Sequence, residues 1–201
     1  SDVCSSDLAL LLLSAAYNAP PTRLKGRPIL DSLANVLYAI PLQVGLHAAG
    51  STNPVDAPVL LFAAWGIGAH ALTTITDRDE DAAARVRTIA VYLGRRATAL
   101  FAASWFVVVG LVASLLGYGA LALLALPYLG LCLVGRDASG AAGRRLYRLF
   151  LVANVAIGAF VTALVLLALP VEAALPAGLL ALTGTLLALG VSVGRALLRR
   201  R

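Results

Sequence analysis

The basic residues of this sequence are separated from its apolar stretches, and this separation restricts the fold more than any other feature. All 16 Lys and Arg residues fall into four clusters. The clusters lie within residues 23–27, 78–96, 136–148 and 195–201. Charged residues make up only 13% of the chain and hydrophobic residues 60%, whereas a soluble domain has roughly 25% charged residues. So few charges cannot cover a water-facing surface, and we therefore predict an integral membrane protein built mostly of helices.

Connectors without Lys or Arg alternate with the basic clusters. These connectors are residues 50–57, 117–119 and 170–174. Because every second connector is basic, the positive-inside rule places the basic connectors in the cytoplasm. The net charge of +6 is then a topology signal, with chemistry in the first two clusters, and nucleic acid is excluded as a partner because the basic residues form no single patch. We predict a multi-pass protein of a prokaryotic plasma membrane, with a basic cytoplasmic tail at residues 194–201 beside anionic lipid headgroups.

Apolar stretches long enough to cross a membrane recur along the chain. A bilayer core of roughly 30 Å needs about 20 apolar residues in a helix. The candidate spans are residues 57–75, 97–116, 120–134, 149–169 and 173–193. A sixth candidate, residues 29–49, is amphipathic at its start, and we expect it to bend at Pro41.

The first residues of the chain suit neither a span nor a signal peptide. Residues 8–16 are too short to cross a membrane, and we interpret them as the end of a helix that starts further upstream. Residues 1–8 are polar and have no basic n-region or cleavage signal, so we expect a non-native leader there. The rest of the chain, residues 9–201, is predicted to form a single transmembrane domain.

Four acidic residues follow the span at residues 57–75. They are Asp77, Asp79, Glu80 and Asp81. On a helix Asp77 and Asp81 are four residues apart and share a face. Two carboxylates with open coordination positions suit a Mg²⁺ ion that also holds substrate phosphate oxygens. The other interpretation is a solvated acidic helix segment paired with Arg85 and Arg87, and the residues alone do not decide between the two.

The first basic cluster follows a pair of prolines that stiffen the chain. Arg23, Lys25 and Arg27 could clamp a diphosphate, with arginine as a fork and lysine as a point charge. Taken alone, the cluster is explained more simply by ordinary positive-inside charge. Both loops are predicted to face the same side of the membrane, however. Together they suggest a site for a metal-bound diphosphate ester with an apolar tail.

At this point the residues resemble a known family. Residues 17–31 look like the Y-S-x-P-P-x-R-x-K loop of UbiA-type intramembrane prenyltransferases, and residues 76–94 look like the D-x-x-x-D motif of that family followed by T-x-A-x-x-L-G. The matching residues of the second motif are Asp77, Asp81, Thr88, Ala90, Leu93 and Gly94. The resemblance covers about residues 8–169. It implies an all-α, polytopic transmembrane helix bundle with about six spans plus a partial N-terminal helix, as a fragment of a UbiA-like nine-helix bundle.

Further residues resemble lycopene elongase-type carotenoid prenyltransferases. They are Trp65-Gly66, His70, Asp31-Ser32 and the segment from Asn35 to Tyr38. This resemblance implies transfer of a prenyl group from an allylic diphosphate to a carotenoid such as lycopene, with a quinone-ring acceptor as the nearest alternative. A membrane transporter or structural protein is the alternative of another class. Its polar residues should lie near mid-depth, whereas here the charged residues lie outside the predicted spans.

The resemblance also implies roles for individual residues. Asp77 and Asp81 would hold Mg²⁺ and, with Tyr17 and Lys25, make up the catalytic set. Arg23, Lys25 and Arg85 would bind the diphosphate. His70, Tyr38 and Trp65, with Phe62 beside them, are candidates for the acceptor pocket. For His70 a hydrogen bond between helices is an equally good interpretation, and lipid contact or packing is a simpler one for the aromatic residues.

Two departures from the family pattern stand out. The first aspartate-rich motif of the family, N-D-x-x-D-x-x-x-D, is absent from this sequence, and Arg85 stands where glycine is usual. The missing motif fits an N-terminally truncated chain. We therefore expect an incomplete site and an inactive fragment of an active enzyme.

Overall fold

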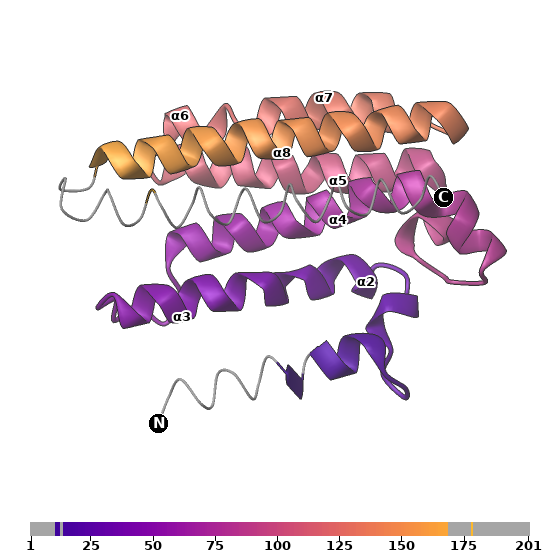
Figure 1. Ribbon diagram of the computed structural model, residues 1–201, viewed down its shortest axis with the longest axis horizontal. Helices are drawn as coiled ribbons and strands as arrows, with labels where there is room; N and C mark the ends of the chain where they lie inside the picture. The colour runs from indigo at the N-terminus through magenta and orange to yellow at the C-terminus, as the bar shows by residue number, and fades with distance from the viewer. Residues whose placement is uncertain (1–10, 13, 169–177, 179–201) are drawn as a thin grey trace. The chain divides into compact units, whose positions relative to one another are not determined.

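The structure is a computed structural model that describes residues 11, 12, 14–168 and 178 (Figure 1). Its elements within these residues are helical, and none of the described residues is in a strand. The elements are η1 (Leu24–Gly26), α2 (Leu30–Leu33), η2 (Ala34–Ala39), α3 (Ile40–Ala48), α4 (Ala57–Ala83), α5 (Ile89–Leu115), α6 (Gly119–Ala122), α7 (Ala125–Gly135) and α8 (Gly140–Ala168). The predicted all-α class is therefore confirmed. The chain divides into two compact units, residues 1–151 and 152–201, and the functional residues discussed below lie in the first.

Three described helices are long and apolar enough to cross a membrane. They are α4, α5 and Gly140–Leu164 of α8. The predicted span at residues 120–134 is instead two helices, α6 and α7, separated by two residues. The predicted span at residues 173–193, the leader and the basic tail lie outside the described residues.

Helix α4 is longer than the apolar run that predicts it. It starts at the N-cap Asp56 and ends at Ala83, so the four acidic residues are helical. Its buried side chains include Leu72 and Ile75, which are about 1% exposed, and it packs along α5. The apolar run ends at residue 75, whereas the backbone hydrogen bonding of the helix continues to Ala83.

Helix α5 is interrupted at Gly94. This residue has φ 78° and ψ 166°, so the ladder breaks and two helical stretches meet at an angle. Thr98, which is fully buried, donates its hydroxyl to the Gly94 carbonyl at 2.8 Å. The predicted start at residue 97 therefore marks the second stretch, and residues 89–93 form an additional short helical segment.

The predicted helix at residues 29–49 is divided into α2, η2 and α3. The break falls immediately before Pro41, which occupies the first turn of α3, where its missing N–H costs nothing. A 3₁₀ stretch, rather than a simple kink, precedes the proline. Elements α2 and η2 pack on α4, where Gly66 lies beside the Asn35 carbonyl.

Aromatic rings fill the core between α4, α5 and α7. Tyr128 stacks on Phe106 with ring centroids 4.8 Å apart, and it meets Trp65 edge to face at 6.0 Å. Trp65 in turn stacks on Phe62 at 5.5 Å. Such pairs add to the burial of apolar surface. Two of the residues predicted for an acceptor pocket therefore contribute to packing.

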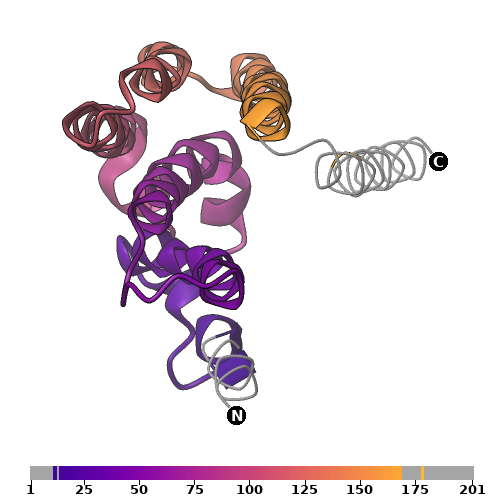
Figure 2. The same cartoon turned by 90° about the vertical axis from the view of Figure 1, so that its left-hand side faces the viewer.

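The connections alternate between the two ends of the first unit. The α3–α4 and α5–α6 connections lie at one end, and the α4–α5 and α7–α8 connections lie at the other (Figure 1). Figure 2 looks along the helices of this unit. The second and third basic clusters are thus at the same end, together with the acidic end of α4.

Candidate functional site

Asp77 and Asp81 lie one turn apart near the end of α4, about 6 Å apart along the axis. Asp77 is exposed and Asp81 is half-buried. Thr76 donates a hydrogen bond to Oδ1 of Asp77 at 2.9 Å, and Thr88 donates one to Oδ2 of Asp81 at 3.1 Å. These bonds orient both carboxylates. The second oxygen of each carboxylate receives no hydrogen bond from the residues that the structure describes.

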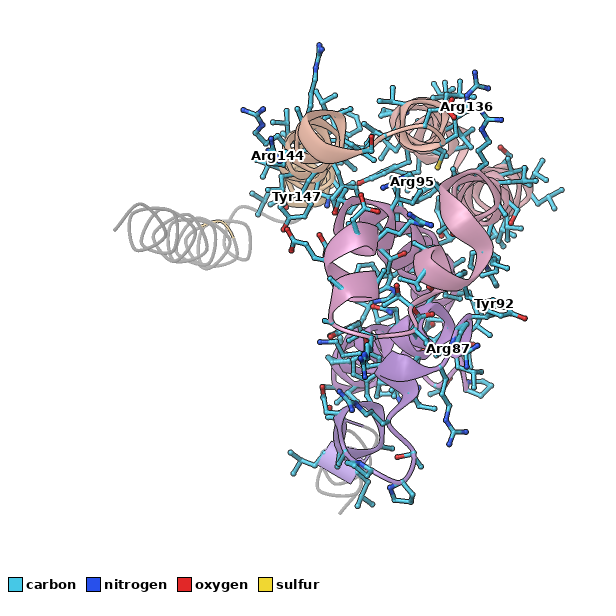
Figure 3. The ribbon with its side chains drawn as sticks, turned by 90° about the vertical axis from the view of Figure 1, so that its right-hand side faces the viewer. Arg87, Tyr92, Arg95, Arg136, Arg144 and Tyr147 are labelled. Carbon is cyan, nitrogen blue, oxygen red and sulfur yellow. The ribbon has the colours of Figure 1, made fainter. Side chains whose placement is uncertain are left out.

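The other acidic residues of the segment have different surroundings. Asp79 pairs with Arg78 and with Arg95, so its charge is neutralised within the chain. Figure 3 looks onto this end of the helices and shows Arg95 among them. Arg87 lies over the ring of Tyr92 at 5.9 Å, and both are labelled in Figure 3. Within the described ranges, neither Asp77 nor Asp81 has an ion pair of the contact type that Asp79 makes.

Lys25 connects the basic loop to the acidic end of α4. It lies in η1, is exposed, and its ammonium interacts electrostatically with Asp81 and with His70. Arg27 donates a hydrogen bond to the Pro21 carbonyl at 3.3 Å. Arg23 is exposed, and in the described part of the chain its side chain has no hydrogen bond or ion pair. The charge of Lys25 therefore acts on Asp81 without an ion pair between them in the described residues, and Arg23 shows no such interaction there.

Arg85 lies in the turn that ends α4. Its φ is 57°, in the left-handed region that favours glycine. The Val86 N–H bonds to the Asp81 carbonyl at 2.8 Å and the Arg85 N–H to that of Ala82 at 3.1 Å, which is the hydrogen-bond pattern of a Schellman motif. This left-handed backbone conformation explains why the family pattern has glycine at the position of Arg85. The exposed Arg85 side chain makes no ion pair with the other described residues.

Asp31 is a central residue that sequence reasoning noted only as part of a resemblance. It is completely buried. Its Oδ2 accepts the N–H of Ile89 at 2.9 Å, and its Oδ1 accepts that of Ser32 at 2.7 Å. Asp31 thus joins the segment after the basic loop to the start of α5. The sequence signal that could have identified Asp31 is an acidic residue next to an apolar run.

Burial affects the ionisation of Asp31. It lies outside the three candidate spans, and desolvation raises the pKa of its carboxyl, while the hydrogen bonds from Ile89 and Ser32 act in the opposite direction. The nearby negative charge of Asp81 raises the pKa further. The desolvation effect is the largest because the side chain has no contact with solvent.

His70 is a residue of α4 that contacts the segments on either side of the basic loop. Its Nδ1 is 3.1 Å from Oγ of Ser32, and its Nε2 is 3.5 Å from the hydroxyl of Tyr17. The predicted interhelical hydrogen bond is thus present. Burial, with smaller contributions from Tyr38 and Asp31, raises the pKa of Tyr17 to about 12. Its phenol therefore stays protonated at neutral pH.

A cavity of about 300 Å³ lies beside Tyr17. Its lining residues are Ser14, Tyr17, Asn18, Ala34, Leu37, Tyr38 and Pro41. Of the four residues predicted for the acceptor pocket, Tyr38 lines this cavity, and His70 is hydrogen-bonded to Tyr17, another lining residue. Trp65 lies instead in the aromatic core.

The donor set at the end of α4 fits a magnesium ion that shares its coordination with substrate. Asp77 and Asp81 each offer a carboxylate oxygen that the described residues leave without a hydrogen bond. Within the described ranges no group of three or more His, Cys, Asp or Glu residues could by itself enclose a metal. Magnesium commonly uses one or two carboxylates plus water and phosphate oxygens. Two carboxylates therefore suffice for one side of such a site.

Comparison with known proteins gives one family. The profile of the UbiA prenyltransferase family matches residues 6–154. The lycopene elongase/hydratase of Haloferax volcanii is 36% identical over 156 residues, which are 77% of this chain and 50% of that protein. The lycopene elongase/hydratase of Halobacterium salinarum is 39% identical over 101 residues, 48% of this chain and 36% of that protein.

A relative outside the archaea is also similar. The C(50) beta-cyclic carotenoids biosynthesis protein LbtBC of Dietzia sp. is 34% identical over 160 residues, 75% of this chain and 37% of that protein. The chain thus spans half or less of the length of these three relatives. No solved structure gives a significant match.

Proposed function

The chain belongs to the UbiA prenyltransferase family, and from this premise we propose that its protein transfers a prenyl group from an allylic diphosphate to a carotenoid such as lycopene. The relatives named for carotenoid chemistry support this acceptor class. The structural observation that carries the proposal is the interaction of Lys25 with Asp81, next to Asp77. A cation and two carboxylates at one helix end suit a metal-bound diphosphate.

Residues at the end of α4 and in the basic loop would together bind the diphosphate and assist its ionisation. Asp77 and Asp81 would hold Mg²⁺, which as a Lewis acid would stabilise negative charge on the phosphate oxygens. Lys25, with Arg23 and Arg85, would neutralise the pyrophosphate as the allylic C–O bond breaks, and Tyr17 is a further candidate donor to it. The cavity described above, which Tyr38 lines, would shield the allylic cation from water until the acceptor alkene attacks.

The chain holds one part of the proposed site. The first aspartate-rich motif of the family is not present in this sequence, and the chain spans half or less of its relatives' length. We propose that Asp77 and Asp81 supply one side of the magnesium–diphosphate site. We expect the 201-residue chain alone to be inactive and the complete protein to be active.

The apolar helices and the basic loops also lead to a proposal for the location and the partners of the enzyme. We propose a multi-pass protein of a prokaryotic plasma membrane, with residues 9–201 in one transmembrane domain and the basic loops in the cytoplasm. Three apolar helices and connections that alternate between two ends (Figure 1) support this topology. The partners would be a prenyl diphosphate, a lipophilic acceptor and membrane lipid, and nucleic acid would not be one.

Product analysis tests the proposed function. Membranes containing the complete protein would be incubated with radiolabelled dimethylallyl diphosphate and Mg²⁺, and with either lycopene or hydroxybenzoate. We expect label in an elongated carotenoid. Label in prenylated hydroxybenzoate would move the assignment to the aromatic branch of the family. Absence of magnesium-dependent diphosphate binding and of any product would contradict a prenyltransferase.

A further inference from the structure

Hydrogen bonds connect Tyr17, His70, Ser32 and Asp31 in one row. Oδ1 of Asp31 accepts the backbone N–H of Ser32 at 2.7 Å and lies 3.4 Å from the Ser32 hydroxyl. With the hydroxyl proton directed to Asp31, the oxygen of Ser32 is the acceptor for Nδ1–H of His70 at 3.1 Å. This assignment leaves Nε2 of His70 with a free lone pair, and Nε2 faces the Tyr17 hydroxyl at 3.5 Å.

The row lies deeper along α4 than the acidic pair. His70 precedes Asp77 by seven residues, which is two helical turns or about 10 Å along the axis on the same face. Lys25 and Asp77 are the charged side chains that act on His70. Ionisable groups within a membrane span are costly and mark functional positions. A diphosphate at Asp77 and Asp81 would therefore direct its prenyl tail toward the level of His70.

Tyr17 belongs both to this hydrogen-bonded row and to the lining of the cavity. It lines the cavity of about 300 Å³ together with Tyr38, and its hydroxyl reaches Nε2 of His70. A substrate in that cavity would meet the Tyr17 side chain, whose hydroxyl has the imidazole beside it. The position suits a group that receives a proton and passes its own proton on.

We propose that Tyr17 and His70 form the proton-accepting pair of the transfer reaction, with Ser32 and Asp31 as positioning residues. This inference rests on the proposed function. The allylic C–O bond breaks and its electron pair leaves with pyrophosphate. The π electrons of the acceptor alkene form the new C–C bond, which leaves a tertiary cation on the acceptor.

A neighbouring C–H bond of that cation then supplies its electrons to a new C=C bond. Its proton goes to the Tyr17 oxygen as the Tyr17 proton moves to Nε2 of His70. The imidazolium keeps its Nδ1–H on Ser32, with the Asp31 carboxylate behind it, and later gives up one proton to water. In this step the Tyr17 hydroxyl acts on the acceptor, and this role replaces the one considered above, in which Tyr17 donates to the pyrophosphate.

The test separates ionisation of the diphosphate from formation of product. The complete protein in membranes and its His70→Gln variant are assayed in parallel for pyrophosphate release and for prenylated acceptor. General acid–base groups contribute roughly 100-fold or more, so we expect His70→Gln to lose product formation by about that factor while it still binds the diphosphate ester and releases pyrophosphate. The control is Thr73→Val, because among the described residues the Thr73 hydroxyl bonds only to the His70 carbonyl of its own helix.

Two further variants distinguish proton transfer from a structural role. Free imidazole should restore product formation to a His70→Gly variant, which a merely structural histidine would not allow. Tyr17→Phe should lose product formation and keep pyrophosphate release. These two variants carry the test if His70→Gln does not fold in detergent.

The outcomes that overturn the inference differ from those that overturn the proposed function. Product formation by His70→Gln within threefold of the wild type would assign the proton to another base, such as pyrophosphate itself. Parallel loss of pyrophosphate release and of product formation in Tyr17→Phe would show that Tyr17 acts on the leaving pyrophosphate instead. A wild-type protein that releases no pyrophosphate and forms no product would overturn the proposed function and this inference together.

Discussion

The carboxylate of Asp31 accepts the backbone N–H of Ile89 at 2.9 Å, across 58 residues of sequence. One buried side chain thereby fixes the segment after the basic loop against the first turn of α5. Thr88, the N-cap of α5, bonds in turn to Asp81. The T-x-A-x-x-L-G segment thus links the two loops that carry the proposed chemistry.

The stability of the protein should depend on the protonation of Asp31. Its pKa is raised above the ordinary value of 3.8, chiefly by burial. An acid with a raised pKa binds its proton more tightly in the folded state, so its contribution to stability is complete below pH 3.8 and is lost as the pH rises through the folded-state pKa. We expect the unfolding temperature of the wild type, measured relative to Asp31→Asn in detergent, to fall as the pH rises above 3.8 through the raised folded-state pKa. A constant difference would show that Asp31 has an ordinary pKa.

Asp77 and Asp81, which form no ion pair within the described residues, should matter far more for activity than the ion-paired Asp79. Asp77→Asn and Asp81→Asn should each lower the turnover of the complete protein by about 100-fold or more, because charge stabilisation at the leaving group is lost. Asp79→Asn is the matched control, since Asp79 pairs with Arg78 and Arg95. Turnover with labelled diphosphate measures all three. Wild-type activity in Asp77→Asn or Asp81→Asn would remove the metal site.

Lys25 and Arg23 should differ although both belong to the same basic cluster. Of these two cations, only Lys25 interacts with Asp81 and with His70 in the described part of the chain. Lys25→Ala should therefore raise KM for the diphosphate and lower kcat, while Arg23→Ala should change both less. Steady-state kinetics at several diphosphate concentrations measure the two parameters. Equal effects would mean that both cations reach the diphosphate once it is bound.

The membrane-spanning helices could be predicted from hydropathy, because apolar length alone determines what can cross a bilayer. The α4 and α5 spans follow this rule. The continuation of α4 to Ala83 could not be predicted in the same way, because polar residues there are held by helix hydrogen bonds rather than by burial. The 3₁₀ stretch before Pro41 depends on packing against α4.

The spacing of Asp77 and Asp81 places them on one helix face, and the structure has them there. The contacts of Asp31 with Ile89 and of His70 with Ser32 join residues 38 or more positions apart. No local pattern encodes such a distance, since it arises when α2 packs on α4. Trp65 shows the opposite case, because an aromatic residue suits a pocket and a core equally well in sequence.

Arg85 should be replaceable by glycine with a gain in stability. Its φ of 57° is a left-handed conformation that costs a side-chain-bearing residue about 1 kcal/mol, part of which the greater entropy of unfolded glycine offsets. We expect a higher unfolding temperature for Arg85→Gly and a few-fold higher KM for the diphosphate, because the proposed cation is lost. Arg85→Lys is the control for charge. An unchanged KM in Arg85→Gly would remove Arg85 from the diphosphate site.

Gly94 should tolerate no side chain, although the space around it is open. A Cβ at Gly94 would meet no atom within 4 Å, so a clash is not the reason. The obstacle is the backbone, since φ 78° with ψ 166° is a region that essentially only glycine adopts, at a cost of roughly 1–3 kcal/mol for other residues. Gly94→Ala should therefore lower the unfolding temperature and displace Thr88 and Asp81 from each other, with a loss of turnover. Gly130→Ala is the matched control, because Gly130 is an exposed helical glycine with no atom within 4 Å of an added Cβ, where alanine should be neutral or stabilising. Equal unfolding temperatures for the two variants would mean that α5 continues through residue 94 without a break.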